Sequence, residues 1–154
     1  MASFRPFLFD TSFMIPMIRG QAYEDQFKRA LRNGKARLSS IVMQELYAGA
    51  LNPGDKRDYD AINRLFVNRG YMVTPTHDDW TLSGIVLARY QERFGKVEPR
   101  NHINDILIAL CAVRATADLI TENAVDMRRW RDMFKRAGKK LSLRCVAREN
   151  FPTL

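Results

Sequence analysis

Hydrophobic residues in this chain form short runs that alternate with longer segments of helical periodicity. The short runs are typical of buried strands, which we predict at residues 7–9, 36–39, 71–73, 118–121 and 141–146. The longer segments predict helices at residues 11–18, 21–32, 40–49, 55–68, 76–94, 101–115 and 125–136. Because strands and helices alternate, we predict an α/β fold, a three-layer α/β/α sandwich around a mainly parallel sheet of about five strands.

Helix caps are predicted from local sequence. Either Ser39 or Ser40 can cap the third helix, and either Thr76 or Asp78 can cap the fifth. The segment 95–100 is a clear loop, and Asn101 is expected to open the helix that follows it.

The first strand runs directly into a carboxylate. Residues 7–15 read Phe-Leu-Phe-Asp-Thr-Ser-Phe-Met-Ile, the pattern of a buried strand that stops and turns into a helix. Asp10 is therefore expected at the carboxyl end of a strand, where ligands bind in open α/β sheets. An Asp in this position can also cap the following helix by accepting a backbone N–H bond, so both roles stay open.

Two further acids interrupt apolar or small faces of predicted helices. Asp105 shares its face with Ile108, Ala109 and Ala112. Glu45 likewise has small or apolar residues at positions 41, 42, 48 and 49. Burying a lone carboxylate is unfavourable unless the group is protonated or paired with a cation.

Such acids can be neutralised in two ways. Asp10, Glu45 and Asp105 could each pair with a separate Lys or Arg, of which the chain has 25. Alternatively, one or two divalent ions at a shared site would neutralise all three. Mg²⁺ and Mn²⁺ prefer oxygen ligands, and carboxylate clusters of this kind serve phosphodiester hydrolysis. The pattern therefore favours a Mg²⁺ or Mn²⁺ site shared by these three acids, with separate ion pairs as the alternative.

More polar residues follow the fourth strand and are expected to reach the same place. Thr121 and Asn123 offer oxygen atoms there. Asp126 is either a further ligand or an acid in the first turn of a basic helix, where it interacts favourably with the helix dipole.

Composition favours one domain spanning residues 1–154. With 46% hydrophobic residues the chain has enough apolar side chains for a core, yet no apolar run approaches the roughly 18 residues needed to span a membrane. The N-terminal residues also lack a signal-peptide pattern. We therefore expect a cytoplasmic protein with no membrane partner. Cys111 and Cys145 have no CxxC spacing, so we expect both to be reduced core residues.

The positive charge is concentrated near the C-terminus. The formal net charge is +8, and residues 124–154 carry nine Lys or Arg against three acids, which is +6 of that total. Such a segment favours a polyanionic partner, RNA or an acidic protein, although many basic helices are simply solvated. The candidates for these contacts are Arg128, Arg129 and Arg131, together with Lys135 and Arg136. Only some of them can share one surface of a helix.

Four stretches, in this order, resemble those of the PIN-domain ribonucleases, and within them the VapC-like toxins of bacterial toxin–antitoxin pairs. They are residues 9–12 with Asp10, residues 39–46 with Glu45, residues 104–109 with Asp105, and residues 121–127. The resemblance spans nearly the whole chain and implies a PIN-like fold. It also implies a Mg²⁺- or Mn²⁺-dependent endoribonuclease that cuts single-stranded or loop RNA, forms a homodimer and is inhibited by a cognate antitoxin.

The resemblance also implies a role for each matching residue. Asp10 and Asp105 would bind the metal, and Glu45 would be a ligand or would position the attacking water. Ser12 and Thr121 would hydrogen-bond to the ligands from a second layer.

The closing motif departs from the family pattern at one position. The family often has an acid where this chain has Asn123, which leaves Asn123, Asp126 and Glu122 open as the fourth ligand. The same departure keeps a second interpretation open, a catalytically inactive PIN-like module that binds RNA or protein.

Other enzyme classes fit the residues less well. His77 or His102 could act as the general base of a metal-independent ribonuclease, although a structural role at a surface or helix start is commoner. A haloacid-dehalogenase-like phosphatase needs an Asp where Ser12 stands. A response-regulator receiver needs an Asp at the end of the third strand, where residues 73–75 read Val-Thr-Pro.

Overall fold

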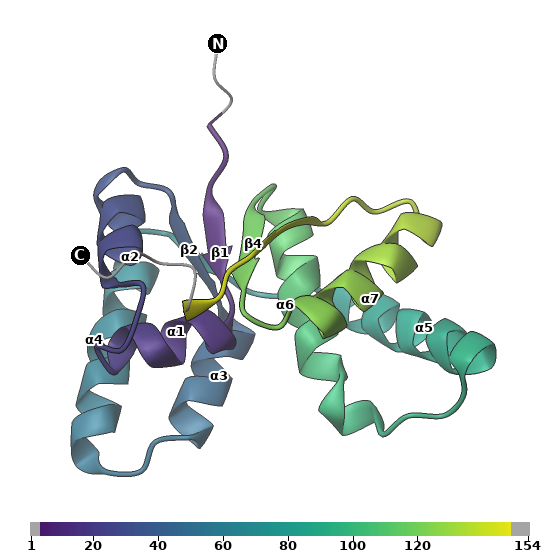
Figure 1. The fold of residues 1–154 in the computed structure, drawn as a ribbon, viewed down its shortest axis with the longest axis horizontal. Coiled ribbons are helices and arrows are strands. Elements are labelled where there is room, and N and C mark those ends of the chain that lie inside the picture. The colour runs from purple at the N-terminus through teal and green to yellow at the C-terminus, as the bar shows by residue number, and fades with distance from the viewer. Residues whose placement is uncertain (1–3, 149–154) are drawn as a thin grey trace.

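A parallel sheet runs through the centre of the molecule (Figure 1). This computed structural model describes residues 4–148. Within that range the sheet has five strands, β1 (Phe7–Phe9), β2 (Ala36–Ser39), β3 (Met72–Val73), β4 (Asp118–Thr121) and β5 (Ser142–Cys145). They pair in the order β3-β2-β1-β4-β5, and every pair is parallel. The predicted α/β fold with a mainly parallel sheet is confirmed.

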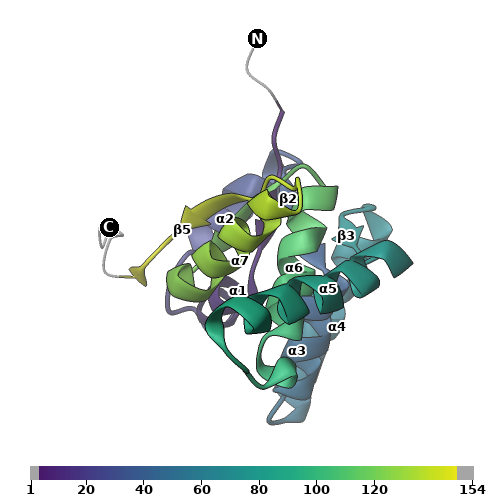
Figure 2. The same ribbon diagram turned by 90° about the vertical axis from the view of Figure 1, so that its right-hand side faces the viewer.

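Helices cover both faces of the sheet (Figure 1). The first group is α1 (Thr11–Ile18), α2 (Glu24–Arg32), α3 (Ser40–Ala48) and α4 (Pro53–Asn68). The second group is α5 (His77–Phe94), the 3₁₀ turn η1 (Pro99–Asn101), α6 (Ile103–Arg114) and α7 (Ala124–Arg136). Figure 2 shows this second group from its own side, where α7 contacts β5, α6 and α5. That one domain takes in all of residues 1–154 stays a prediction.

The strand order reverses at β1. The chain moves from β1 outward to β2 and β3, and then returns through α5 and α6 to β4 on the other side of β1. The carboxyl ends of β1 and β4 therefore meet at the topological switch point, where ligands bind in open α/β sheets. Asp10 follows β1 directly and Glu122 follows β4.

Side-chain caps fix the starts of two helices near the sheet. Ser39 caps α3 by accepting a 3.0 Å hydrogen bond from the backbone N–H of Ile41. Thr76 caps α5 in a reciprocal capping box with Asp79. Of the paired alternatives in the sequence, Ser39 and Thr76 are the caps.

Three helix starts differ from the prediction. α2 begins three residues late because the residue before it, Tyr23, has a left-handed φ of 69°. α4 begins early at Pro53, which suits the first helical position and follows the cap Asn52. α6 begins at Ile103 because Pro99 first starts a separate 3₁₀ turn.

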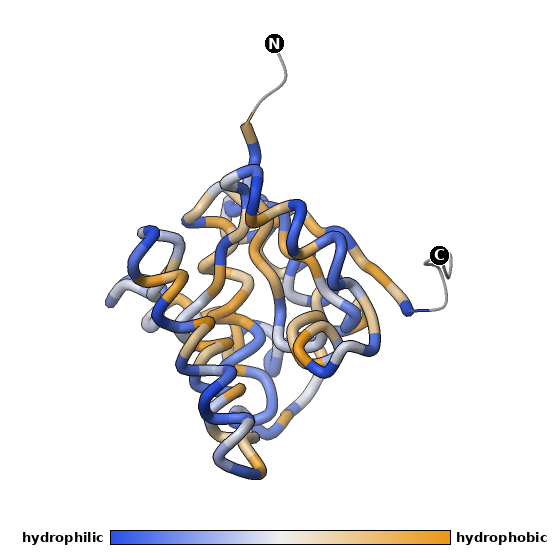
Figure 3. Tube along the Cα trace, turned by 90° about the vertical axis from the view of Figure 1, so that its left-hand side faces the viewer, coloured by the Kyte–Doolittle hydropathy of each residue, from blue (hydrophilic) through white to orange (hydrophobic). Residues whose placement is uncertain are grey.

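The core lies between the sheet and the inner faces of the helices. Leu8 of β1, Phe66 of α4 and Trp130 of α7 are fully buried in it. Figure 3 shows the same division along the chain, with hydrophobic strands inside and hydrophilic turns on the outer helices. Cys111 is buried as predicted, but the prediction for Cys145 was wrong. Cys145 is exposed because it ends the edge strand β5, whose last two residues face outward.

Candidate active site

Asp10 lies at the carboxyl end of the central strand, with only 3% of its surface exposed. Its Oδ1 accepts a 2.9 Å bond from the backbone N–H of Thr11 and so caps α1. Its Oδ2 accepts bonds from the hydroxyls of Ser12, at 3.0 Å, and Thr121, at 2.7 Å. Burial raises the pKa of Asp10, and these hydrogen bonds partly offset the rise. The capping role is therefore present, and the second oxygen is held in place as well.

Two hydroxyls tie the ends of β1 and β4 together beside Asp10. The Ser12 and Thr121 hydroxyl oxygens lie 3.2 Å apart. The backbone N–H of Glu122 donates to Ser12 Oγ at 2.9 Å, and that of Asn123 donates to Thr121 Oγ1 at 2.9 Å. Ser12 and Thr121 thus hold the Asp10 carboxylate in one orientation.

Glu45 comes to the same place from α3, which begins right after the neighbouring strand β2. Thr11 Oγ1 donates a 2.7 Å hydrogen bond to its Oε1. Burial raises the pKa of Glu45, the bond from Thr11 lowers it, and the negative charge of Asp10 raises it again. A side-chain hydrogen bond from Asn104 also favours the charged form. Thr11 and Asn104 were not predicted as site residues, although each is the direct sequence neighbour of a predicted acid.

Asp105 completes the set from the first turn of α6, where it is half-buried. Its pKa is raised to about 7, first by burial and then by the negative charges of Asp10, Glu45 and Asp126. A carboxyl that responds to three others shares one electrostatic neighbourhood with them. We call Asp10, Glu45, Asp105 and Asp126 the carboxylate cluster.

The closing motif turns its side chains in two directions. Asn123 Nδ2 donates to Asp126 Oδ2 at 3.2 Å, and Asp126 also lies 3.7 Å from Arg129 Nη1. Glu122 points elsewhere, since it forms an ion pair with Arg148 at 3.2 Å and its charge acts on buried Tyr23. Of the three residues left open by the sequence, Asp126 is the one whose charge reaches Asp105.

The three predicted acids have no cationic partner among the residues that the structure describes. The ion pairs in this part of the chain involve other carboxylates, such as Asp79, Asp118 and Glu122. Asp10, Glu45 and Asp105 are therefore not neutralised by Lys or Arg, which was the first of the two possibilities raised by the sequence.

A divalent cation suits this cluster chemically, because burial and then repulsion between the acids raise the pKa of Asp105, and a bound cation would offset both effects. Hard oxygen donors from carboxylates are also what Mg²⁺ and Mn²⁺ prefer. As the side chains stand in residues 4–148, no three His, Cys, Asp or Glu groups are close enough together to hold a metal ion. Metal binding would therefore require the acid side chains to move closer together.

The two histidines lie in different surroundings. His77 is exposed at the start of α5. His102 caps the start of α6 through its backbone and packs its ring at 5.6 Å, edge to face, against Trp130. This ring contact gives His102 a structural role and leaves the carboxylates as the chemical groups at the switch point.

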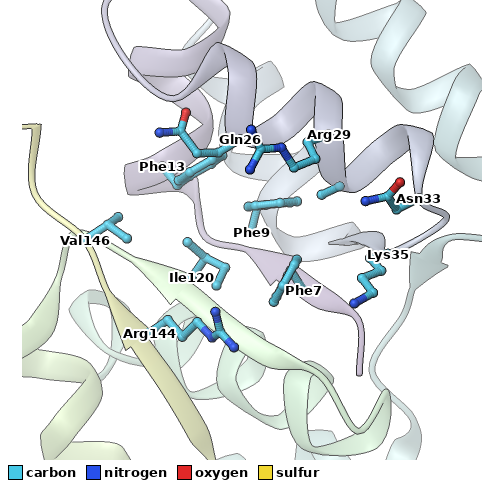
Figure 4. Close-up of a pocket in the computed structure, with 11 residues that line it drawn as sticks. Phe7, Phe9, Phe13, Gln26, Arg29, Asn33, Lys35, Ile120, Arg144 and Val146 are labelled. Atoms are coloured by element: carbon cyan, nitrogen blue, oxygen red, sulfur yellow. The ribbon is translucent and has the colours of Figure 1, made fainter. Parts of the chain in front are cut away.

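A concave surface lies on the face that carries α1 and α2 (Figure 4). This apolar hollow, about 400 Å³ in volume, is floored by Phe7, Phe9, Phe13 and Ile120. Cationic and polar residues surround the floor, namely Gln26, Arg29, Asn33, Lys35 and Arg144, with Ala30 and Val146 completing the lining. It contains no carboxylate, so it is separate from the cluster.

The sequence of residues 7–131 matches the family described as the PIN domain. The chain belongs to the PIN-domain family. The match takes in the carboxylate cluster, from Asp10 to Asp126. The resemblance inferred from four short motifs is thus confirmed at the level of the family. No curated protein matches this PIN domain in sequence.

Solved structures share the fold of this PIN domain. The DNA-bound VapBC of Salmonella typhimurium has a TM-score of 0.65 at 18% identity, covering 92% of this chain and 98% of that chain. VapBC2 of Rickettsia felis, bound to a promoter DNA fragment, has 0.63 at 21%, covering 92% and 98%. FitAcB of Neisseria gonorrhoeae has 0.57 at 16%, covering 94% and 99%. In the described part of this chain, no helix is both long and apolar enough to cross a membrane.

Proposed function

We propose that this PIN domain is a metal-dependent endoribonuclease, a VapC-like toxin that hydrolyses phosphodiester bonds in single-stranded or loop RNA. The observation that carries the proposal is the carboxylate cluster, whose acids Asp10, Glu45 and Asp105 have no cationic partner in residues 4–148. Members of the PIN-domain family are typically nucleases, which agrees with this proposal.

Mg²⁺ or Mn²⁺ would be held by Asp10 and Asp105, with Glu45 and Asp126 as further oxygen donors. Asn123 would act through Asp126, to which it donates a hydrogen bond. When bound, the ion supplies positive charge that lowers the pKa of a nearby water and offsets charge on the phosphoryl oxygens.

The protein's own groups prepare the site for this chemistry. Ser12 and Thr121 hold Asp10 in one orientation through the bonds at 3.0 and 2.7 Å. Thr11 holds Glu45 at 2.7 Å, and the raised pKa of Glu45 suits it to accept a proton from an attacking water. The backbone N–H groups of residues 122 and 123 fix the two hydroxyls in turn.

The test is cleavage of structured cellular RNA by the purified chain with Mg²⁺, Mn²⁺ or a chelator. We expect cuts that need the metal and that disappear in Asp10→Asn and Asp105→Asn. The exposed acid Asp58 on α4 provides a matched control, since Asp58→Asn makes the same chemical change away from the cluster and from α7. Metal-dependent cutting retained in Asp10→Asn would refute the mechanism.

A second candidate function is an inactive PIN-like module that binds RNA or protein. The observation that favours it is Asn123, whose amide stands where the family often has an acid and hydrogen-bonds to Asp126. A folded chain that neither binds Mn²⁺ nor cuts RNA would establish this alternative.

We also propose a cognate antitoxin as the partner, because the structural neighbours are toxin–antitoxin complexes. The apolar hollow, with Arg29 and Lys35 at its rim, would suit an antitoxin segment in which apolar residues alternate with acids. Co-purification with the protein encoded beside its gene tests this, and Arg29→Glu with Lys35→Glu should weaken it. Arg57→Glu on α4 is the control. A homodimer and a cytoplasmic location are further parts of the proposal, the first testable by size-exclusion chromatography and the second by cell fractionation.

A further inference from the structure

The basic residues of α7 separate onto two sides of the helix. The inward side carries the buried residues Met127, Trp130 and Phe134. At 100° per residue, Arg129 and Arg136 lie to one side of this buried face. Arg128, Arg131 and Lys135 lie to the other side, at the spacing of three and four residues that aligns side chains along a helix.

The first side is occupied by contacts with α5. The guanidinium of Arg129 lies 5.1 Å from the ring centre of Tyr90 and 5.9 Å from that of Trp130, and it also approaches Asp126. Arg136 lies beside it, in a hollow lined by Tyr90 and Phe94. Arg129 was predicted as an RNA or antitoxin contact, and that role stays a prediction. Because its guanidinium already makes these contacts, we leave it out of the surface described next.

The second side continues into the loop after α7. Gly138, with a left-handed φ of 75°, turns the chain back, so that the N–H of Lys139 bonds to the carbonyl of Phe134 at 2.9 Å. Buried Leu141 then anchors the segment to the core. This turn places Lys139 and Lys140 beside Lys135. Together with Arg131 they surround a hollow of about 570 Å³, whose one lining acid, Asp132, is outnumbered by these four cations.

Five cations therefore form one continuous row, Arg128, Arg131, Lys135, Lys139 and Lys140, which we call the basic stripe. All five are exposed. Arg131 approaches Asp132 at 3.3 Å, and no ion pair involves the other four in the described part of the chain.

We infer that the basic stripe binds the phosphate backbone of single-stranded RNA, with the hollow between Arg131 and Lys140 as its centre. The inference rests on the proposed ribonuclease function and adds the surface that holds the substrate. Phosphate contacts need closely spaced, unpaired cations and little else. A protein partner would instead need apolar or aromatic anchors, and in the hollow the one apolar side chain, Leu141, is only 5% exposed.

The experiment measures binding of a fluorescent poly(U) RNA by the full chain at several KCl concentrations. All proteins carry Asp10→Asn, so that cutting does not interfere and RNA binding is read independently of catalysis. The stripe variant is Lys135→Gln/Lys139→Gln/Lys140→Gln. The control variant, Arg57→Gln/Arg64→Gln/Arg69→Gln, removes the same charge from exposed positions on α4 and at its C-cap, across the sheet (Figure 1).

The stripe variant should bind RNA roughly ten-fold more weakly than its parent, and its plot of log K against log salt should be shallower by about 2. The control variant should change neither quantity by a comparable amount. Equal losses in the two variants would show a general effect of net charge and overturn the inference. Unchanged RNA binding with lost binding of poly-glutamate would show a protein contact and overturn it too. If the stripe variant loses RNA binding but the wild-type chain never cuts RNA, the proposed ribonuclease function is refuted while the inferred RNA-binding surface stands.

Discussion

The hydroxyl of Thr121 donates a 2.7 Å hydrogen bond to Oδ2 of Asp10, although 111 residues separate the two in sequence. They meet because β1 and β4 are parallel neighbours with Phe9 opposite Ile120. The same hydroxyl accepts the backbone N–H of Asn123. Thr121 therefore links the orientation of the central acid to the path of the chain into α7.

Replacing Thr121 by Val keeps the volume of the side chain and removes this hydroxyl. The bond favours the charged form of Asp10, so its loss should raise the pKa of Asp10 further. We expect RNA cleavage to fall about ten-fold at neutral pH, an energy of about 1.4 kcal/mol, and the acidic limb of the pH–rate profile to move to higher pH. Thr121→Ser, which keeps the hydroxyl, should restore both. A profile unchanged in Thr121→Val would contradict the role given to this bond.

The raised pKa of Asp105 leads to a prediction of how the stability of the metal-free chain depends on pH. Its folded-state pKa of about 7 is above the ordinary carboxyl value of 3.8, so the folded chain holds a proton that the unfolded chain has lost. Stability should therefore fall as pH rises from about 4 to about 7 and then level off. Asp105→Asn removes this dependence, and we expect it to unfold at a higher temperature than the wild type at pH 8.

At pH 8 the stability of Asp105→Asn should exceed that of the wild type by about 1–2 kcal/mol, or about 3–6 °C in melting temperature. The difference is no larger because the half-buried carboxyl of Asp105 is partly screened by solvent. This difference should vanish near pH 4. Thermal melts in chelator at a series of pH values give the measurement. The exposed control Asp58→Asn should follow the wild type throughout, and a wild type that gained stability between pH 4 and 7 relative to Asp105→Asn would oppose the prediction.

Divalent metal should stabilise the folded chain, because the acids of the carboxylate cluster influence one another only in the native state, where folding brings their elements together. At a Mn²⁺ concentration ten times its dissociation constant we expect a gain of about 1.4 kcal/mol, or about 3–5 °C in melting temperature. Asp10→Asn and Asp105→Asn should lose most of this gain, and Asp58→Asn should keep it. Ca²⁺ and K⁺ at matched ionic strength separate metal binding from screening. A gain that survives in both cluster variants would place the metal elsewhere.

Arg114 gives a prediction about stability alone. It donates to both carboxylate oxygens of Asp79, at 2.7 and 2.9 Å, and to Thr76 Oγ1 at 2.8 Å, so it joins α6 to the capping box of α5. Because Arg114 is 42% exposed, we expect Arg114→Ala to cost only about 1–2 kcal/mol.

The hydrogen bonds from Arg114 lower the pKa of Asp79. The ion pair therefore stabilises the folded chain above the ordinary carboxyl range, and this stabilisation is lost as pH falls. The difference between wild type and Arg114→Ala in urea unfolding should therefore shrink in acid. The Mn²⁺-induced gain should be unchanged in this variant, since Arg114 contacts no member of the carboxylate cluster. Loss of that gain would mean that the fold around the cluster had changed.

The parallel sheet and the positions of three acids could be predicted because they depend on local patterns. Asp10 follows an apolar run that is short enough to be a buried strand, and Asp105 interrupts an apolar helix face. Both patterns depend on which neighbours are buried, and burial is what hydrophobic periodicity records. The left-handed Tyr23 gave no such signal, because nothing in the sequence around it marks a residue with positive φ.

The closing motif could not be resolved from sequence, because three polar residues within one helical turn compete for the same space. The structure separates them through partners that are distant in sequence. Arg148 holds Glu122, while Asn123 turns toward Asp126. The different surroundings of the two sides of α7 could not be predicted from sequence either, because Tyr90, the aromatic residue that Arg129 contacts, belongs to α5. Pairings between distant elements of this kind follow from tertiary packing and leave no local periodicity.

The placement of β1 between β2 and β4 has a consequence for synthesis of the chain. A ribosome that has made only the first hundred residues has produced Asp10 and Glu45, but neither Asp105 nor the hydroxyl of Thr121. The central strand then has one of its two sheet partners, since β4 is still to come. The carboxylate cluster is therefore incomplete until residue 126 has been made, and the apolar hollow is completed soon afterwards by Arg144 and Val146.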